Sequence, residues 1–331
     1  MDSEMTAALG YLVLAGIMNS AYTLPLKLKL TWKWENMWLA FTILGVCIVP
    51  TTLGMLTIPH FWSIYGQIKL SMLLIVCLSG ATWGVALLLF GLAVDVVGVA
   101  ITFALVMGTS AGVGALLPLL VKGTGGVSIR TGFLILFGIA LTVVGVGLCG
   151  AAGKQREKDD ALKGGVTGLG FLRGFVFAVL SGLAAGSTLI DAARERGSSP
   201  RMATNAAWVP VLLVGAVPGV LYCAYLLRKN RSSKNFFCLR TFPYLFLALL
   251  MGVLWFGSVV LYGWATLRIG NLGAVLGWPL FMVTIVLGSA LWGAATGEWK
   301  NASVRARVLM GCAVSVLIAA IIVLTKAQAS T

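Results

Sequence analysis

Polar side chains within long apolar runs are the residues of this sequence best suited to chemistry. Asn19 and Tyr22 lie near the end of the first apolar run, just before the helix-perturbing Pro25. A charge at the centre of a bilayer costs roughly 2.5–3.5 kcal/mol on insertion scales, so polar groups kept inside a membrane are candidates for function. They can hydrogen-bond a polar solute or hold neighbouring helices together. We expect Asn19 and Tyr22 to contact a solute.

Aromatic residues deep in the runs form a second group of candidates, made up of Trp83, Trp255, Tyr262 and Trp278. Aromatic faces stack on the C–H surface of a sugar or on a flat organic cation. Trp83 and Trp255 hold equivalent positions in an internal repeat, which predicts that they face each other across a central cavity. Aromatic bulk that faces lipid is the alternative interpretation.

Asp191 is the carboxylate best suited to carrying a proton. It ends an apolar run that contains Ser187 and Thr188. A carboxylate partly withdrawn from water can take up and release a proton within the working pH range. A helix cap, or an ion-pair partner for Arg194 or Arg196, is the alternative role.

Several kinds of chemistry are not expected. His60 is the only histidine, and the six cysteines are too far apart in sequence to suggest a zinc or redox pair. The chain has no GxxxxGK[ST] phosphate loop, which argues against an ATP-driven pump. The net charge of +14 comes from short basic clusters between apolar runs, a pattern typical of membrane loops. We therefore predict no enzyme activity, cofactor, metal or nucleic-acid partner.

The composition requires lipid as the solvent of this protein. The 331 residues are 59% hydrophobic and only 10% charged, whereas soluble domains contain about 25% charged residues. A helix that crosses about 30 Å of hydrocarbon needs about 20 apolar residues. Ten such runs can be recognised. They cover about 5–26, 37–58, 70–94, 99–121, 131–152, 171–190, 205–227, 242–266, 272–295 and 305–325.

The two halves of the chain resemble each other. The sequence WGVALLLFGLAVDVVG from Trp83 matches WFGSVVLYGWATLRIG from Trp255 at a constant offset of 172. A charged linker at 154–170 separates a first five-helix repeat at 1–153 from a second at 171–331. Because five is an odd number, the second repeat enters the membrane in the opposite orientation, as in many secondary transporters. We predict an all-α membrane protein with ten transmembrane helices arranged as two inverted five-helix repeats.

Charge predicts the orientation of these helices. Of the 24 Lys and Arg residues, 16 lie in the odd-numbered loops. The positive-inside rule places these loops in the cytoplasm and both termini outside.

The first loop, PLKLKLTWKWENMW from Pro25 to Trp38, resembles that of the bacterial L-rhamnose–proton symporters. The resemblance continues in order with IPHFW at 58–62, GATWG at 80–84, YGW at 262–264 and EWKNA at 298–302. It implies the ten-helix fold of the drug/metabolite transporter superfamily, import of a 6-deoxyhexose with protons, and cytoplasmic termini. The last of these disagrees with the orientation that charge predicts.

The chain departs from that family pattern at residues near the expected site. Leu87, Leu89 and Phe90 stand where the resemblance implies more polar groups, and Phe281 stands where it implies a histidine. Buried hydroxyls left unpaired cost roughly 1–3 kcal/mol each, so a sugar needs polar partners. The resemblance therefore supports the scaffold more strongly than the substrate.

These features predict a secondary active transporter of the bacterial inner membrane. It would take up a small polar solute with H⁺ by alternating access, such as L-rhamnose or another deoxyhexose. The predicted substrate-binding residues are Asn19, Tyr22, Trp83, Trp255, Tyr262 and Trp278, and the predicted proton carrier is Asp191. An exporter of small metabolites or organic cations on the same fold is the alternative, and a non-transporting assembly partner is another. The expected partners are a small-molecule substrate and the lipid bilayer, with the chain a monomer or homodimer.

Overall fold

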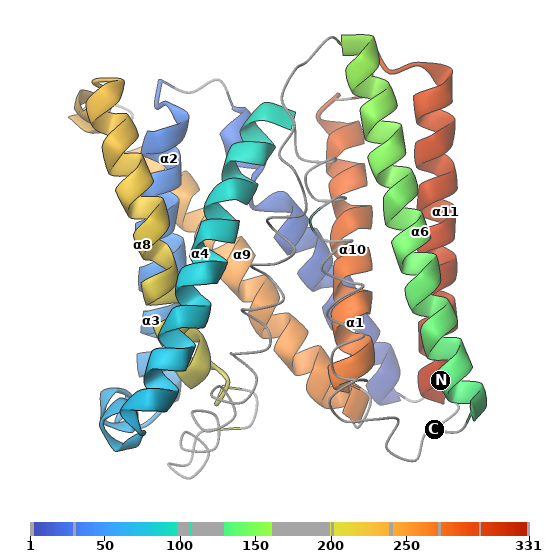
Figure 1. Ribbon diagram of the computed structural model, residues 1–331, viewed down its shortest axis with the longest axis horizontal. Helices are drawn as coiled ribbons and strands as arrows, with labels where there is room; N and C mark the ends of the chain where they lie inside the picture. Colours follow the sequence, from blue (N-terminus) through green and yellow to red (C-terminus); the bar gives the residue numbers. More distant parts are fainter. Residues whose placement is uncertain are drawn as a thin grey trace. The chain divides into compact units, whose positions relative to one another are not determined.

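The computed structural model describes residues 3–28, 31–97, 106, 129–160, 199, 202–237, 241–270, 273–297 and 299–329. Every regular element in these ranges is helical (Figure 1). Eight of the described helical segments are long and apolar enough to cross a membrane. They are Glu4–Lys27, Trp34–Thr57, Leu70–Ala93, Ile129–Gly153, Asn205–Lys229, Thr241–Ile269, Leu276–Ala295 and Val304–Ala327. Eight of the ten predicted runs coincide with them. The other two, at 99–121 and 171–190, lie outside the described residues except for residue 106.

The described helices form two compact units. The first, called the α4–α8 unit, contains α2 (Trp34–Phe41), α3 (Val49–Thr57), most of α4 (Leu70–Val97), α8 (Asn205–Lys229) and α9 (Thr241–Ile269) as far as Val260. The second, called the α6–α11 unit, contains α1 (Ser3–Ala21), α6 (Ile129–Asp160), α10 (Gly273–Ala295), α11 (Val304–Ala329) and the end of α9. Each unit combines helices from both halves of the sequence.

The second membrane span is a helix with a wide turn in its middle. The segment η2 (Thr42–Ile48) is wound as a π-helix between α2 and α3. Pro50 follows it near the start of α3 and has no amide hydrogen to donate to the carbonyl of the preceding turn. The lost hydrogen bond explains why the winding changes at this point of the span.

Glycines set the closest helix contacts of the α4–α8 unit. A Cβ added to Gly84 of α4 would meet the carbonyl oxygen of Gly215 on α8. Likewise, Gly45 of η2 and Gly252 of α9 face each other so closely that neither position has room for a side chain. Small residues allow helix backbones to approach within a membrane, where packing and hydrogen bonding drive association.

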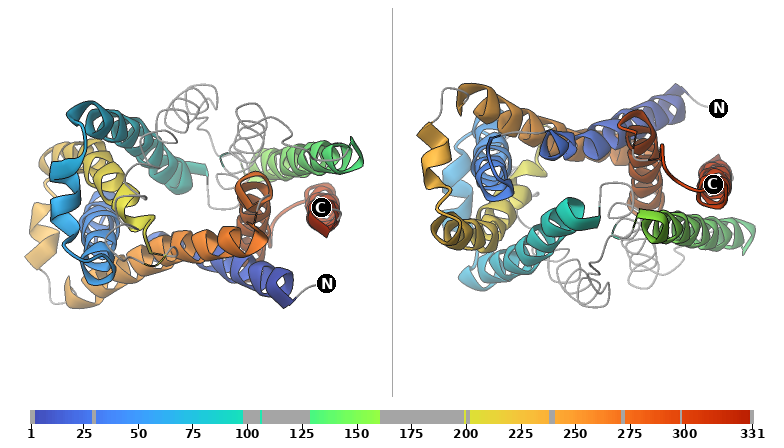
Figure 2. Two further views of the ribbon diagram at one scale, coloured as in Figure 1. Left: turned by 90° about the horizontal axis from the view of Figure 1, so that it is seen from below. Right: turned by 90° about the horizontal axis from the view of Figure 1, so that it is seen from above.

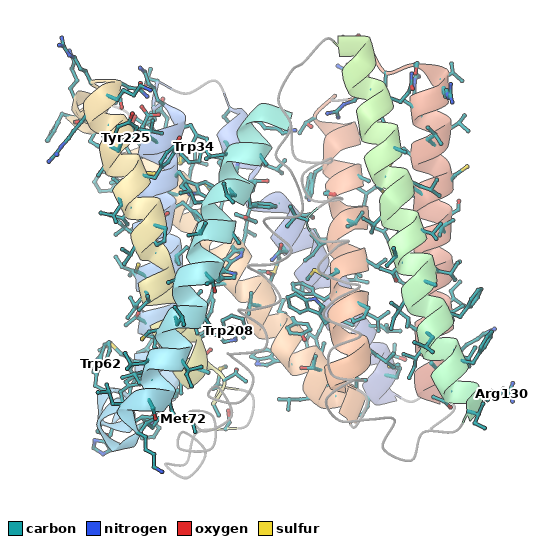
Figure 3. The ribbon with its side chains drawn as sticks, in the orientation of Figure 1. Trp34, Trp62, Met72, Arg130, Trp208 and Tyr225 are labelled. Carbon is teal, nitrogen blue, oxygen red and sulfur yellow. The ribbon has the colours of Figure 1, made fainter. Side chains whose placement is uncertain are left out.

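The second span and α8 lie side by side in opposite directions within the α4–α8 unit. Near the start of α2, the Asn36 amide donates to the Ser232 carbonyl after α8, at 3.0 Å. At the other end, the Asn205 amide of α8 donates to the Thr57 hydroxyl of α3, at 3.3 Å. Aromatic residues mark both ends (Figure 3), with Trp34 and Tyr225 at one and Trp62 and Trp208 at the other.

Two helix pairs build the α6–α11 unit. α6 and α11 lie side by side in both views of Figure 2 and run antiparallel, with Gly138 packed against Leu324 and Gly145 against Leu317. α1 and α10 run parallel. The Thr284 hydroxyl of α10 lies 3.1 Å from the Leu12 carbonyl of α1. Further along both helices in the same direction, Gly288 of α10 meets the Ser20 hydroxyl of α1.

The outer surface of both units is apolar. Large hydrophobic side chains such as Leu56, Leu221, Phe133 and Leu291 are exposed along the helices. Apolar surface on this scale is stable only when lipid covers it. The chain is therefore a multi-pass α-helical membrane protein.

Candidate functional site

Tyr22 occupies a break in the first membrane span. α1 ends at Ala21, and a 3₁₀ turn with Pro25 in its first positions follows at Leu24–Lys27. Proline cannot donate the hydrogen bond that would continue the α-helix, so the chain changes winding here. The Tyr22 side chain is only 2% exposed and belongs to the α4–α8 unit.

The Tyr22 ring lies in an aromatic cluster. It stacks on Phe41 at a centroid distance of 5.5 Å and on Phe90 at 6.3 Å, with interplanar angles of 29° and 19°. Phe41 in turn meets the edge of Trp255 at 6.3 Å. Offset stacking and edge-to-face contacts are the arrangements that aromatic quadrupoles favour. We call these residues, together with Trp83, the Tyr22 cluster.

Trp83 and Trp255 belong to the same cluster, but their arrangement differs from the predicted one. Their ring centroids are 5.6 Å apart, so the two indoles are in contact. The prediction that they face each other across a cavity is therefore wrong. The glycines at Gly84 and Gly215 bring α4 and α8 together at this level, and the Trp83 ring packs against Gly215.

A buried hydroxyl lies next to this cluster in the chain. Thr23 is fully buried, and its Oγ1 has no hydrogen-bond partner among the described residues. An unpaired buried hydroxyl costs roughly 1–3 kcal/mol. Such a group is suited to a hydroxyl of a bound solute. Its position directly after Tyr22 and two residues before Pro25 was the signal in the sequence.

Tyr262 and Trp278 form a separate aromatic group in the α6–α11 unit. Tyr262 stacks on Phe281 at 4.9 Å and meets Trp278 edge-on at 5.6 Å. Asn19 belongs to the same unit and is buried in α1, one residue before Ser20 at the contact with α10. The predicted substrate residues are thus distributed over both units, three in each.

The predicted proton carrier, Asp191, lies outside the described residues. Another charged residue, Arg268, lies near the end of α9. It donates to Glu4 in the same unit and lies over the ring of Tyr11, at 5.4 Å. Both charged groups are partly exposed, at 21% for Arg268 and 64% for Glu4. This geometry favours a boundary ion pair over a role in transport.

A buried carboxylate that is not among the predicted site residues lies at the start of α2. Glu35 is 3% exposed. Its Oε1 accepts hydrogen bonds from the Ser232 hydroxyl at 2.6 Å and the Asn230 amide at 2.9 Å. Asn36 also reaches this loop and completes a capping box with the Lys33 backbone. We call this group the Glu35 clasp. An acidic residue at the end of a basic loop, directly before an apolar run, was its signal in the sequence.

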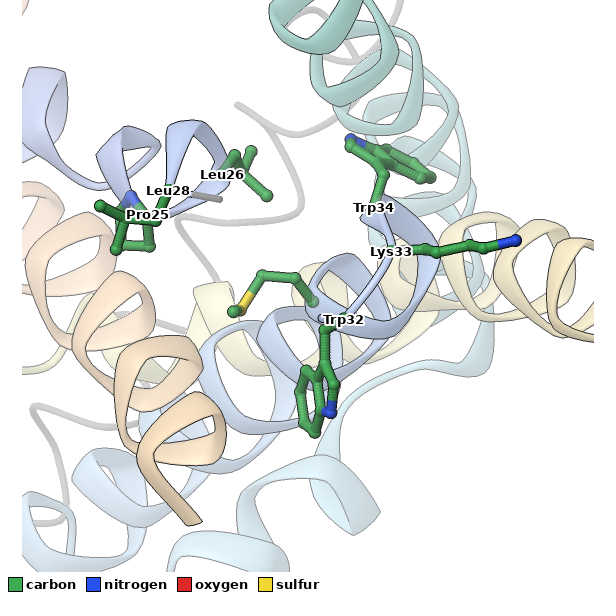
Figure 4. Close-up of a pocket in the computed structure, with 7 residues that line it drawn as sticks. Pro25, Leu26, Leu28, Trp32, Lys33 and Trp34 are labelled. Atoms are coloured by element: carbon green, nitrogen blue, oxygen red, sulfur yellow. The ribbon is translucent and has the colours of Figure 1, made fainter. Parts of the chain in front are cut away.

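A small recess opens beside the clasp (Figure 4). Its volume is about 50 Å³, and its walls come from the turn at Pro25, Leu26 and Leu28 and from Trp32, Lys33, Trp34 and Met37. Pockets that hold small-molecule ligands measure about 300–1,000 Å³. This recess is therefore too small to be the substrate site in the conformation described.

Metal-binding groups do not come together in the described part of the chain. No three His, Cys, Asp or Glu side chains among these residues are arranged to hold a metal ion. What the described site offers is aromatic faces, buried hydroxyls and amides within membrane spans, which is the chemistry of solute binding.

These features define a multi-pass membrane protein with an aromatic and polar interior. Comparison with known proteins identifies its family. The model of the L-rhamnose-proton symport protein (RhaT) family matches residues 1–328. The L-rhamnose-proton symporters of Salmonella typhi, Salmonella newport and Salmonella typhimurium are each 29% identical over 346 residues, covering 99% of this chain and 100% of the relative. This chain belongs to the L-rhamnose-proton symport protein family.

Proposed function

We propose that this protein imports L-rhamnose, or a closely related 6-deoxyhexose, together with protons. The observation that carries the proposal is the family match along residues 1–328, with full-length relatives named as L-rhamnose-proton symporters. The direction of transport, the sugar and the coupling ion are inferred for this chain from the names of those relatives. The helical membrane architecture and the Tyr22 cluster are compatible with such a role.

We further propose ten membrane crossings, from the directions of the described helices. α10 and α11 are joined by a short connection and cross in opposite directions, and α6 is antiparallel to α11, so α1, α6 and α10 all run the same way. An odd number of crossings must then separate α1 from α6, and the spans at Trp34–Thr57 and Leu70–Ala93 supply two. The apolar run at about 99–121 has the length for the third.

The same count applies between α6 and α10. α8 and α9 supply two crossings, and the run at about 171–190 has the length for the third. Ten crossings divide into five-helix repeats at 1–153 and 171–331 around the linker at 154–170. This is the inverted plan of many secondary transporters, and it is what the drug/metabolite transporter superfamily implies.

The substrate contacts we propose are aromatic stacking and a few hydrogen bonds. The Tyr22 cluster supplies ring faces, and the Thr23 hydroxyl lacks a partner among the described residues. Asn19, Tyr262 and Trp278 stay predictions of the sequence. A sugar has hydroxyl groups on its edge and C–H groups on its face, so it needs both kinds of contact.

Uptake by the purified protein in proteoliposomes tests the proposal. Labelled L-rhamnose should accumulate when the outside is made acidic, and a protonophore should abolish the accumulation. Asp191→Asn should remove proton-driven accumulation and retain exchange of labelled for unlabelled sugar. Accumulation by Asp191→Asn equal to that of the native chain would remove Asp191 from the mechanism. Absence of any rhamnose exchange by the native chain would reject the substrate.

Export of small metabolites or organic cations is the second candidate function. Phe90 stacks on Tyr22 and Phe281 stacks on Tyr262, and aromatic rings in a site withdrawn from water attract cations. A drug-sensitised bacterial host separates the two functions. Resistance to organic cations without rhamnose uptake would favour export.

Location and assembly follow from the family and the apolar surface. We propose that the chain resides in the bacterial inner membrane, where the relatives from Salmonella would carry a sugar into the cell. A monomer or a homodimer is the expected assembly.

A further inference from the structure

Basic side chains gather at one end of the α4–α8 unit. They are exposed, and they lie at the start of α2 and around the end of α8: Lys33, Arg228, Lys229, Arg231 and Lys234. Within the described ranges, none of them forms an ion pair. The nearby Glu35 carboxylate is buried and accepts its hydrogen bonds from Asn230 and Ser232. We call these five residues the basic patch. Its positive charge is therefore available to an external anion.

The loop that carries the patch has a defined backbone. The amide of Ser232 donates to the Leu227 carbonyl at 3.1 Å, and Arg231 adopts a left-handed conformation with φ of 51°. The Glu35 clasp holds this turn from one side. The Trp32 indole stabilises the turn that follows, because its N–H donates to the Asn235 carbonyl at 2.8 Å. The cations thus project from a fixed frame and lose less entropy when they bind.

Aromatic side chains place the patch at the boundary between lipid and water. Tyr225, one turn before the end of α8, is 56% exposed, and the Lys229 ammonium lies 5.8 Å from its ring centroid. Phe237 and Phe242 beyond the patch are 90% and 86% exposed. Figure 3 shows side chains with nitrogen ends leaving this end of α8 near Tyr225. Exposed aromatic rings next to exposed cations are typical of the depth at which lipid headgroups lie.

We propose that the basic patch binds the phosphate group of an anionic phospholipid such as phosphatidylglycerol. Clusters of four to eight Lys or Arg residues beside a membrane helix attract anionic lipids. The aromatic rings favour a lipid over a soluble anion, because they contact acyl chains while the cations contact the phosphate. This inference does not depend on which solute the protein carries.

Native mass spectrometry of the full-length protein tests the proposal. The protein in neutral detergent is offered equal amounts of phosphatidylglycerol and phosphatidylcholine, which differ in net charge. We expect at least about ten-fold more retained phosphatidylglycerol, since each basic residue near an anionic surface contributes on the order of a five-fold factor. The preference should fall as salt is added, because exposed charges are screened. Equal retention of the two lipids would overturn the proposal.

Three variants locate the binding. The triple variant Lys229→Gln/Arg231→Gln/Lys234→Gln should lose the preference. The control Lys69→Gln/Arg130→Gln/Lys300→Gln removes the same charge from exposed positions outside the patch and should keep it. Lys229→Arg/Arg231→Lys/Lys234→Arg keeps every charge and should also keep the preference for phosphatidylglycerol. Its result shows whether substitution at these three positions disturbs the fold.

A loss of the preference in the control equal to that in the patch variant would contradict a local site. Competition by inorganic phosphate at equal concentration would assign the patch to a soluble anion.

Discussion

The hydroxyl of Tyr22 is a sensitive probe of sugar contact at the scale of one residue. Tyr22→Phe keeps the ring between Phe41 and Phe90 and removes only the polar atom. If this hydroxyl contacts the sugar, its loss should raise the KM for rhamnose about 5- to 150-fold, which corresponds to roughly 1–3 kcal/mol. The maximal rate and the yield of folded protein should change little. Initial uptake rates in proteoliposomes measure both constants.

Tyr225→Phe is the matched control for that substitution. It removes the same atom from an exposed ring at the end of α8 and should leave the KM unchanged. A KM that is the same in Tyr22→Phe and the native protein would give Tyr22 a packing role only.

The Glu35 clasp makes a prediction about stability. Ser232→Ala removes one of the two side-chain donors to Glu35 Oε1. Hydrogen bonds to a charged group contribute roughly 1.5–3 kcal/mol, so thermal unfolding in detergent should begin several degrees lower. The neighbouring Ser233 is exposed, and Ser233→Ala should have no such effect. Similar midpoints for the two variants would contradict the clasp.

At the scale of helices, the crossing of α4 and α8 requires glycine. Gly84→Ala would place a methyl group against the backbone of Gly215, and backbone cannot move aside as a flexible side chain can. The helices would have to separate, so we expect a loss of about 1–3 kcal/mol, as for other overpacked positions. Unfolding in detergent and rhamnose uptake should both report the loss.

Gly147 of α6 provides the control for that helix contact. A Cβ there has nothing within 4 Å, and alanine favours a helix by up to about 1 kcal/mol over glycine. Gly147→Ala should therefore be neutral or stabilising. A Gly84→Ala protein as stable as Gly147→Ala would show that the two helices are not packed closely at this crossing.

The helices were predictable from the sequence because crossing lipid needs a long apolar run, and eight of the runs are spans in the structure. The π-helical turn at η2 could not be predicted in this way. A proline in the sequence indicates where a helical hydrogen bond is lost, but not how the helix changes its winding in response. The grouping of Tyr22 with Trp83 and Trp255 depends on which helices pack together. Periodicity is weak in helices that are apolar all round, so the contact of Trp83 with Trp255 could not be foreseen.

For the whole molecule, the directions of the helices determine which loops share a side of the membrane. In the α4–α8 unit, Ser63 follows the second span and Ser233 follows α8, and both are exposed. The second span and α8 are antiparallel, and Ser63 lies in η3 (Phe61–Gln67) near the start of α8. The two serines should therefore lie on opposite sides of the membrane. By the positive-inside rule, the basic residues Arg228, Lys229 and Lys234 predict that Ser233 lies in the cytoplasm.

Single cysteines at these positions test the arrangement in a chain whose six native cysteines have been replaced. A membrane-impermeant maleimide added to intact cells should label Ser63→Cys and spare Ser233→Cys, and permeabilised cells should label both. The opposite pattern would reverse the orientation and agree with cytoplasmic termini, as the superfamily resemblance implies. Labelling of both positions in intact cells would contradict an odd number of crossings between them. Since ten crossings would put five spans, an odd number, between Ser63 and Ser233, that result would remove the inverted repeat as well.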